Sequence, residues 1–165
     1  MNKSKKSLGL VEFVALMAMM TSLTAMSIDS MLPALSEISL DLGVKRSNDS
    51  QLVISSLFMG MVVGQMFLGP LSDTLGRKPT VYIGFGLFTT GCLMSMLSTN
   101  FQFMLAGRVL QGLGSAAPRI VVLAIVRDLY SGREMARVMS FVMAVFIIVP
   151  VVAPLFGQAV LIVSH

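Results

Sequence analysis

Three charged residues, Asp29, Arg108 and Arg119, lie inside long apolar stretches of the sequence. A charged side chain at the centre of a bilayer costs roughly 2.5–3.5 kcal/mol on insertion scales, so such residues usually face a polar interior and have a function there. A carboxylate in that position can take up and release a proton in alternation with the binding of a substrate. These residue types therefore suggest proton-coupled transport.

The two arginines belong to one apolar stretch, residues 101–126, and lie on one side of it. They are eleven positions apart in the sequence, and at 100° per residue a helix brings such residues back to within about 20° of each other. Ser115 lies on the same line and Gln111 lies beside it. This spacing predicts one continuous polar face. For Arg119 the alternative is a side chain that extends to the cytoplasmic interface, because a long basic side chain can bury its stem and keep its charge in water.

Asp29 lies in the outer half of the first apolar stretch, at a depth that matches that of Arg108 to within about one helical turn. Because the first stretch runs outward and the fourth runs inward, we expect Asp29 and Arg108 to share a water-accessible cavity. A static buried ion pair is the alternative. The residues expected to couple proton and substrate are Asp29, Arg108, Gln111, Ser115 and Arg119.

The composition requires elements that cross a membrane. Of 165 residues, 55% are hydrophobic and 12% are charged, and the mean hydropathy is +0.85, whereas about a quarter of the residues in a soluble domain are charged. Apolar runs bounded by charged residues, Pro or Gly predict helical spans of about 20 residues each. We therefore predict an all-α integral membrane protein with five transmembrane helices. The expected spans are residues 8–32, 51–71, 79–97, 101–126 and 138–163.

Lys and Arg residues in the connecting segments predict the orientation of the helices, because basic loops stay in the cytoplasm. Eight of them fall on the side of the N-terminus and two on the other side. The eight are Lys3, Lys5, Lys6, Arg77, Lys78, Arg127, Arg133 and Arg137, and the two are Lys45 and Arg46. The N-terminus is therefore expected in the cytoplasm, and five crossings place His165 outside. A cleaved signal peptide is the alternative for the Lys-rich start, but the first stretch carries Glu12 and Asp29 and has no A-x-A site.

The residue types and motifs of the chain argue against several function classes. Cys92 is the only cysteine, so no disulfide can form within the chain. No His/Cys cluster, phosphate-binding Walker loop or nucleophile elbow is present, and the net charge of +4 is distributed over short loops. We therefore expect no enzyme activity, no metal site, no nucleic-acid partner and no cofactor apart from the proton gradient.

Small residues and prolines predict how the helices pack and bend. Ser56, Gly60 and Gly64 are spaced four residues apart, and this small-xxx-small ladder lets two helix backbones approach closely. In the last span, Pro150 and Pro154 interrupt the helix, so we expect a kink there.

The segment between the second and third spans carries a motif. It reads Gly69-Pro70-Leu71-Ser72-Asp73-Thr74-Leu75-Gly76-Arg77-Lys78 and resembles the G-x-x-x-D-x-x-G-R-K signature of the major facilitator superfamily. Gly76 permits a tight turn, and Asp73 can hold basic groups nearby. The resemblance implies a cytoplasmic gating loop that makes and breaks contacts during alternating access. Its residues would be Gly69, Asp73, Gly76, Arg77 and Lys78.

Two further motifs are similar to those of this family. Residues 107–114 resemble the R-x-x-Q-G-x-G motif, which implies a role for Arg108 in proton coupling. Residues 153–158 are similar to the G-P-x-x-G-G motif of drug antiporters at Pro154 and Gly157, but they lack its first and last glycines. The residues expected at the helix kink are Pro150, Pro154 and Gly157.

Residues 28–35 and 124–132 narrow the resemblance to the Bcr/CflA branch of drug:proton antiporters, the group that exports bicyclomycin and chloramphenicol. The resemblance covers nearly the whole chain. It implies a proton-coupled multidrug exporter, an antibiotic-resistance protein of the bacterial inner membrane with a periplasmic C-terminus. Asp29 would be the membrane-embedded acid that takes up a periplasmic proton as a lipophilic drug leaves, with Arg108 modulating its protonation.

Members of this family have twelve helices in two halves of six, each built from inverted repeats. The resemblance therefore implies that residues 1–165 are an incomplete N-terminal domain, and we expect a truncated form of the exporter. Two alternatives stay open. One is a membrane interaction protein, or half-transporter, that needs a separate C-terminal half. The other is a homodimeric pore formed by self-assembly.

Overall fold

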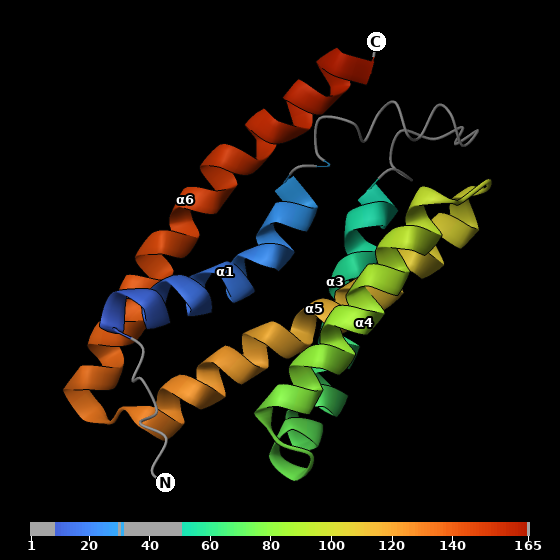
Figure 1. Ribbon diagram of the computed structural model, residues 1–165. Coiled ribbons are helices and arrows are strands. Elements are labelled where there is room, and N and C mark those ends of the chain that lie inside the picture. Colours follow the sequence, from blue (N-terminus) through green and yellow to red (C-terminus); the bar gives the residue numbers. More distant parts are fainter. Residues whose placement is uncertain (1–8, 30, 32–50, 165) are drawn as a thin grey trace, which may run out of the picture.

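The computed structural model describes residues 9–29, 31 and 51–164, without the side chains of Thr24, of residues 149–151 and of residues 153–164. Five helices make up this part of the chain (Figure 1). They are α1 (Leu10–Asp29), α3 (Gln51–Thr74), α4 (Arg77–Met96), α5 (Phe101–Leu129) and α6 (Gly132–Ser164). The all-α fold class predicted from the sequence is confirmed, and each helix overlaps one predicted span.

Two helices extend beyond the apolar stretches from which they were predicted. α5 continues three residues beyond the predicted end at residue 126, and α6 starts at Gly132, ahead of the predicted start at residue 138. Polar residues can continue a helix into water, so hydropathy underestimates its length. At the start of α5, Oδ1 of Asn100 accepts a hydrogen bond of 2.7 Å from the backbone N–H of Phe103 and caps the helix.

Three of the described helices, α1, α3 and α5, are long and apolar enough to cross a membrane. α4 has 20 residues, but glycine and threonine occupy many of its positions. In α6, most side chains of the C-terminal half are not described. Helices of this length and hydropathy are those of a membrane-embedded protein, as the composition predicts.

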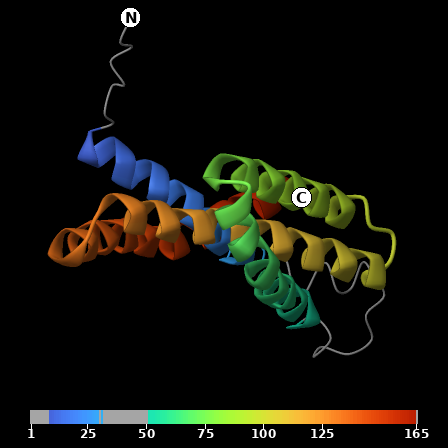
Figure 2. The same ribbon diagram turned by 90° about the horizontal axis from the view of Figure 1, so that it is seen from below.

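α5 lies at the centre of a bundle with α3 and α4 (Figures 1 and 2). A Cβ added at Gly60 would clash with the backbone of Val109. One added at Gly112 would clash with the backbone of Leu57, and one added at Gly64 would come within 2.6 Å of the α5 backbone. The packing role predicted for Gly60 and Gly64 is confirmed, because the two helices touch where only glycine leaves room.

α4 packs against another side of α5 through a second set of glycines. Gly91 of α4 lies against the backbone of Gln111. A Cβ added at Gly84 would lie 2.9 Å from the carbonyl oxygen of Gly114. Pro118, four residues further along α5, has no N–H to donate to that carbonyl. The carbonyl of Gly114 therefore faces α4 at a point where Gly84 makes room for it.

α1 packs along α6 and against the C-terminal part of α5 (Figure 1). A cluster of buried side chains fills this contact, and it contains no glycine. Its members are Phe13, Val14, Met17, Ala18, Val122, Val126, Val138 and Val142. The ring of Phe13 also lies 5.8 Å from that of Tyr130, measured between centroids. Side chains therefore separate these helices, whereas in the α3–α5 and α4–α5 contacts the backbones approach closely.

Several sequence predictions fall outside the described residues. The basic tail and the segment 32–50 carry five of the Lys and Arg residues from which the orientation is predicted. α6 is helical over Gly132–Ser164, but the side chains of Pro150 and Pro154 are not described. The kink expected at these prolines and Gly157 therefore stays a prediction.

Candidate functional site

A cavity of about 480 Å³ lies between α1, α3, α5 and α6. Its polar lining residues are Thr21, Asp29 and Arg119. The apolar residues are Ala25, Ile28, Phe58, Met61, Val122, Leu123, Met139, Val142, Met143 and Phe146. On α1 the lining extends from Thr21 to Asp29, which corresponds to about 12 Å along the helix axis. A space of this size and composition suits a lipophilic small molecule.

The two charged residues of this cavity come from different helices. Asp29 is the last residue of α1 and is half-buried. Arg119 follows Pro118 in α5, is exposed and lines the cavity. Within the part of the chain that the structure describes, neither side chain forms a salt bridge or a hydrogen bond. Both groups are therefore free to meet a ligand.

Arg108 does not line this cavity, contrary to the expectation that it would share one with Asp29. Equal depth does not bring the two side chains together, because α1 meets α5 at Val122 and Val126, toward the C-terminal end of α5. The part of α5 around Arg108 packs between α3 and α4 instead. The arginine that lines the cavity with Asp29 is Arg119.

The polar face predicted on α5 divides into two parts. Arg108 donates a hydrogen bond of 3.0 Å from Nη1 to Oε1 of Gln111, and its Nε is buried without a hydrogen-bond partner. Gln111 and Ser115 are buried, with 4% and 2% of their surfaces exposed. Ser115 donates a hydrogen bond of 2.7 Å to the backbone carbonyl of Gly112. Of the four side chains in the predicted face, Arg119 is the one that lines the cavity.

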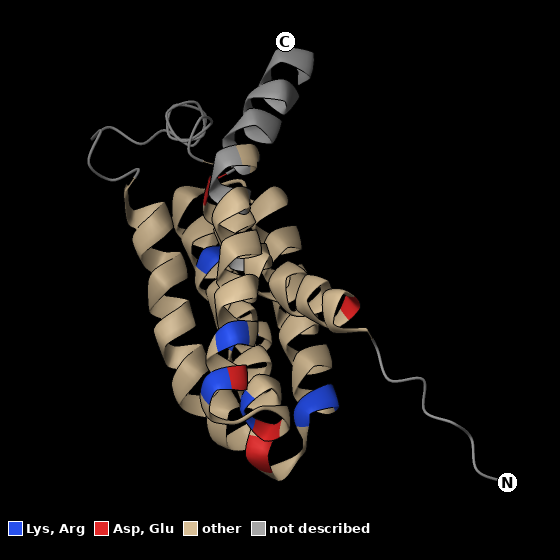
Figure 3. Cartoon of the chain, turned by 90° about the vertical axis from the view of Figure 1, so that its left-hand side faces the viewer, with Lys and Arg blue, Asp and Glu red and all other residues tan. Residues whose placement is uncertain are grey.

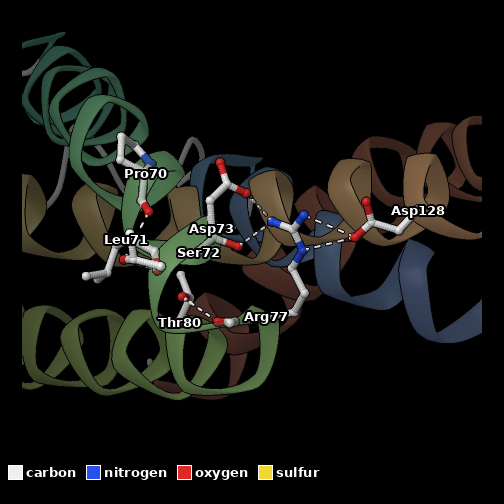
Figure 4. A network of polar contacts seen from close by, with 9 residues as sticks. Pro70, Leu71, Ser72, Asp73, Arg77, Thr80 and Asp128 are labelled. Carbon is white, nitrogen blue, oxygen red and sulfur yellow. Dashed lines mark hydrogen bonds and ion pairs between the residues drawn. The ribbon is translucent and has the colours of Figure 1, made fainter.

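The turn between α3 and α4 forms a network of polar contacts around Arg77 (Figure 4). Nη1 of Arg77 donates hydrogen bonds to Oδ1 of Asp73 at 2.8 Å and to Oγ of Ser72 at 2.9 Å. Its Nε and Nη2 donate to Oδ2 of Asp128 at 3.2 and 3.1 Å. The hydrogen bond to Asp73 is the largest of the effects that raise the pKa of the Arg77 guanidinium, which lies ahead of the predicted span. Arg77 therefore stays charged and joins the turn to the last turn of α5.

The structure explains the residue type at one of the other motif positions of this turn, but not at all of them. Gly76 has φ 96, in the left-handed region that favours glycine, so the predicted tight turn is present. A Cβ added at Gly69 would meet open space, and nothing in the structure explains a glycine there. Lys78 is exposed and forms no ion pair with any described residue.

Sequence reasoning did not identify Ser72 and Asp128 as partners of Arg77. Ser72 has 1% of its surface exposed, and Asp128 is 51 residues away from Arg77 in the chain. Both fall within stretches that resemble family motifs, but their pairing depends on how α3, α4 and α5 pack. The signal available in the sequence was an acidic residue on the same predicted side of the membrane as the turn.

Most of the charged residues gather at one end of the described structure (Figure 3). That end contains the α3–α4 turn and the α5–α6 turn, which carry Asp73, Arg77, Lys78, Arg127, Asp128, Arg133 and Glu134. Among the described residues, no group of three or more His, Cys, Asp or Glu side chains is placed to hold a metal ion. The candidate site is therefore the cavity, together with the charged turn at this end of the bundle.

Comparison with known proteins identifies relatives over most of the chain. A family model described as Major Facilitator Superfamily matches residues 15–164. The uncharacterized MFS-type transporter YdgK of Bacillus subtilis is 36% identical over 146 residues, which make up 88% of this chain and 36% of the relative. A bicyclomycin resistance protein homolog of Haemophilus influenzae is 34% identical over 148 residues, 88% of this chain and 36% of the relative. The multidrug resistance protein MdtL of Shigella flexneri is 34% identical over 134 residues, 81% of this chain and 34% of the relative.

The chain spans about a third of the length of these curated relatives. The family match includes most of α1 and all of α3, α4, α5 and α6, and therefore both the cavity and the charged turn. Proteins of this family are transporters rather than enzymes. On the family match and these relatives, the chain belongs to the major facilitator superfamily.

Proposed function

We propose that the chain forms part of a proton-coupled multidrug exporter of the Bcr/CflA type in the bacterial inner membrane. In this proposal the N-terminus lies in the cytoplasm and a lipophilic drug-like molecule occupies the cavity. Asp29 takes up a periplasmic proton as the drug leaves. The names of two relatives, one for bicyclomycin resistance and one for multidrug resistance, support drugs as the substrate class.

The observation that carries this proposal is the position of Asp29. Its carboxylate lines a largely apolar cavity and has no ion-pair partner among the described residues. A charged carboxylate inside a membrane is costly without a partner, so exchange of a proton for a substrate gives this residue a function. A static pair between Asp29 and Arg108 has no support, because Arg108 bonds to Gln111 instead.

In this proposal Arg108 acts through α5 rather than through direct contact with Asp29. Its Nε is buried and lacks a hydrogen-bond partner, and a buried donor without a partner is costly. We expect this N–H to gain a partner in another conformation of the transport cycle. Movement of α5 would then couple a change at Arg108 to the position of Arg119, which lines the cavity eleven residues further along the same helix.

The α3–α4 turn is the gate in this proposal. Arg77 bonds to Asp73 and Asp128, whose side chains are 71% and 54% exposed. Ion pairs that are exposed to water contribute little to stability, so these contacts can open and re-form as the helices move. The network therefore suits a contact that is made in one conformation and broken in another.

Transport in proteoliposomes tests the proposal, with the purified chain alone and with the chain together with the C-terminal half of a relative. A pH gradient is imposed, and accumulation of radiolabelled chloramphenicol, a neutral lipophilic drug, is measured. We expect accumulation that depends on the gradient and falls to background in Asp29→Asn, because an amide cannot carry the proton. Glu134→Gln is the matched control, since it removes an exposed carboxylate from the first turn of α6. Transport that is unchanged in Asp29→Asn would contradict the proposal.

A half-transporter that needs a separate C-terminal half is the second candidate. This candidate is favoured because the chain covers only about a third of the length of each relative. Reconstitution of the chain with the C-terminal half of a relative separates the two candidates. Transport that requires both parts supports pairing, whereas transport by the chain alone contradicts it. In either arrangement, Asp29→Asn should abolish the dependence on the gradient.

A further inference from the structure

Arg119 gives the cavity a permanent positive charge. Of the described residues that line the cavity, Asp29 and Arg119 carry charge, and an arginine stays protonated at every physiological pH. The Arg119 side chain is exposed and lies beside Val122 and Leu123 in a lining that is otherwise mostly apolar. The cavity therefore holds a guanidinium that is open to a ligand.

Arg119 has no hydrogen bond, ion pair or ring contact with a described residue, in contrast to Arg77, Arg108 and Arg137. Arg77 has two carboxylates and Arg108 has a glutamine. Arg137 lies over an aromatic ring at 5.7 Å. Inside a membrane protein, an arginine without a polar partner is energetically costly unless something else binds it.

The position of Arg119 along α5 argues against a side chain that extends to the interface. Arg119 lies seven residues before residue 126, where the predicted span ends, which corresponds to about 10 Å along the axis. Arg127, in the last turn, is the arginine of this helix that can reach water directly. Arg119 is therefore placed for the cavity rather than for the membrane surface.

We propose that the cavity binds amphiphilic organic anions and that Arg119 selects them by pairing with their carboxylate, sulfonate or phosphonate group. This inference rests on the proposed function, because it takes the cavity to be the substrate site. A guanidinium donates two parallel hydrogen bonds to such a group, and charge assistance makes them stronger than neutral hydrogen bonds. The apolar lining holds the rest of the molecule.

Asp29 and Arg119 have different parts in the proposed cycle. The carboxylate of Asp29 is charged while a substrate is bound and takes up a proton as the substrate leaves, whereas the guanidinium of Arg119 stays charged throughout. Arg119 therefore offers an anion the same positive charge in every state of the cycle, and it favours anions over cations beside it. Asp29 carries the proton, and Arg119 binds the substrate.

Binding of three matched probes to the full chain in phosphatidylcholine nanodiscs tests the inference. The probes are dansyl-undecanoic acid, its primary amide and the corresponding trimethylammonium compound, which share a body and differ in charge. Empty nanodiscs give the partition into lipid, which is subtracted. We expect the acid to bind about tenfold more tightly than the amide, and the ammonium compound to bind more weakly than the acid.

Variants on α5 connect this preference to Arg119. Arg119→Gln should lower the ratio of acid to amide affinity to about one, while Arg119→Lys should keep part of it, because a lysine retains the charge but not the planar fork. Arg127→Gln is the matched control, since it removes the same charge from the last turn of α5, outside the cavity. Unchanged affinity for the amide in Arg119→Gln shows that the cavity is intact.

The outcomes separate this inference from the proposed function. Equal affinities for the three probes, or a ratio that is unchanged in Arg119→Gln, overturn the inference and leave the proposed function standing. Absence of binding for all three probes contradicts the proposed function and the inference with it. The measurement is repeated in nanodiscs that contain phosphatidylglycerol. Displacement of the acid by this anionic lipid would assign Arg119 to a lipid headgroup and overturn the inference.

Discussion

α5 packs in opposite ways on its two sides. Toward α3 and α4 its backbone contacts other backbones at glycines such as Gly60, Gly91 and Gly112. Toward α1 and α6 it contacts valine and methionine side chains, and beside them lies the cavity with Asp29 and Arg119. Where backbones touch, no space remains for a ligand. Where side chains separate the helices, space and charged groups can remain, so the proposed transport chemistry belongs to the second side.

The largest effect is expected where the backbones touch. In Gly112→Ala the added methyl group would clash with the backbone of Leu57, which cannot turn aside as a side chain can. We expect a loss of about 3 kcal/mol, at the upper end of the cost of overpacking. Thermal unfolding in detergent measures it, with a maleimide dye that reacts with Cys92, the single cysteine. Gly86→Ala in α4, where a Cβ meets nothing within 4 Å, should unfold no earlier than the wild type.

A larger side chain on α1 should have different effects in the buried cluster and in the cavity. Ala18 is fully buried in the cluster, whereas Ala25, seven residues further along the same helix, lines the cavity. We expect Ala18→Leu to lose about 2 kcal/mol, because the cluster has no room for the larger side chain. Ala25→Leu should keep the unfolding temperature and weaken probe binding, because its side chain fills the cavity. Equal unfolding temperatures for the two variants would contradict this distinction.

The α3–α4 turn should show a smaller effect that depends on backbone conformation rather than on space. Gly76 has φ 96 and ψ 166, a conformation that is essentially restricted to glycine, so an alanine there costs about 1.5 kcal/mol. Gly69→Ala is the control from the same motif, since its Cβ would meet open space. We expect Gly76→Ala to unfold earlier than Gly69→Ala in the same dye assay. A larger loss in Gly69→Ala would show that this glycine has a structural role absent from the described contacts.

The sequence was sufficient for features that depend on one helix or one turn. Apolar stretches predicted the five helices, because each helix satisfies its own backbone hydrogen bonds in lipid. The spacing of Gly60 and Gly64 predicted close packing, although not with which helix. The turn at Gly76 followed from the residue type, because glycine reaches positive φ without strain.

Features that depend on how the helices contact one another could not be predicted in the same way. The depth of a residue in the membrane can be counted from the sequence, and this count placed Asp29 and Arg108 at a similar depth. Rotation and crossing of the helices are set by packing, and they placed Arg119 beside the cavity instead. The pairing of Arg77 with Asp128 joins residues 51 positions apart, so it follows from the fold rather than from either motif.

The smallest effect is expected for the pair of Arg77 and Asp128, which tests whether the turn is a gate or a structural link. Their side chains are 29% and 54% exposed, and they lie 3.1 Å apart. Water and salt weaken such a pair, so Asp128→Asn should unfold within about 2 °C of the wild type. Arg77→Gln also removes the hydrogen bond to the buried Ser72, so this variant and the double variant should unfold earlier than Asp128→Asn.

Transport should respond differently from stability, because a gate is made in one conformation and broken in another. We expect Asp128→Asn to change the rate of drug accumulation without changing probe affinity, since the pair lies outside the cavity lining. Arg133→Gln, an exposed arginine of the neighbouring turn, is the control. The double variant should transport like Arg77→Gln alone, because that change already removes the contact with Asp128. A large loss of stability with unchanged transport would make the Arg77–Asp128 pair a structural link.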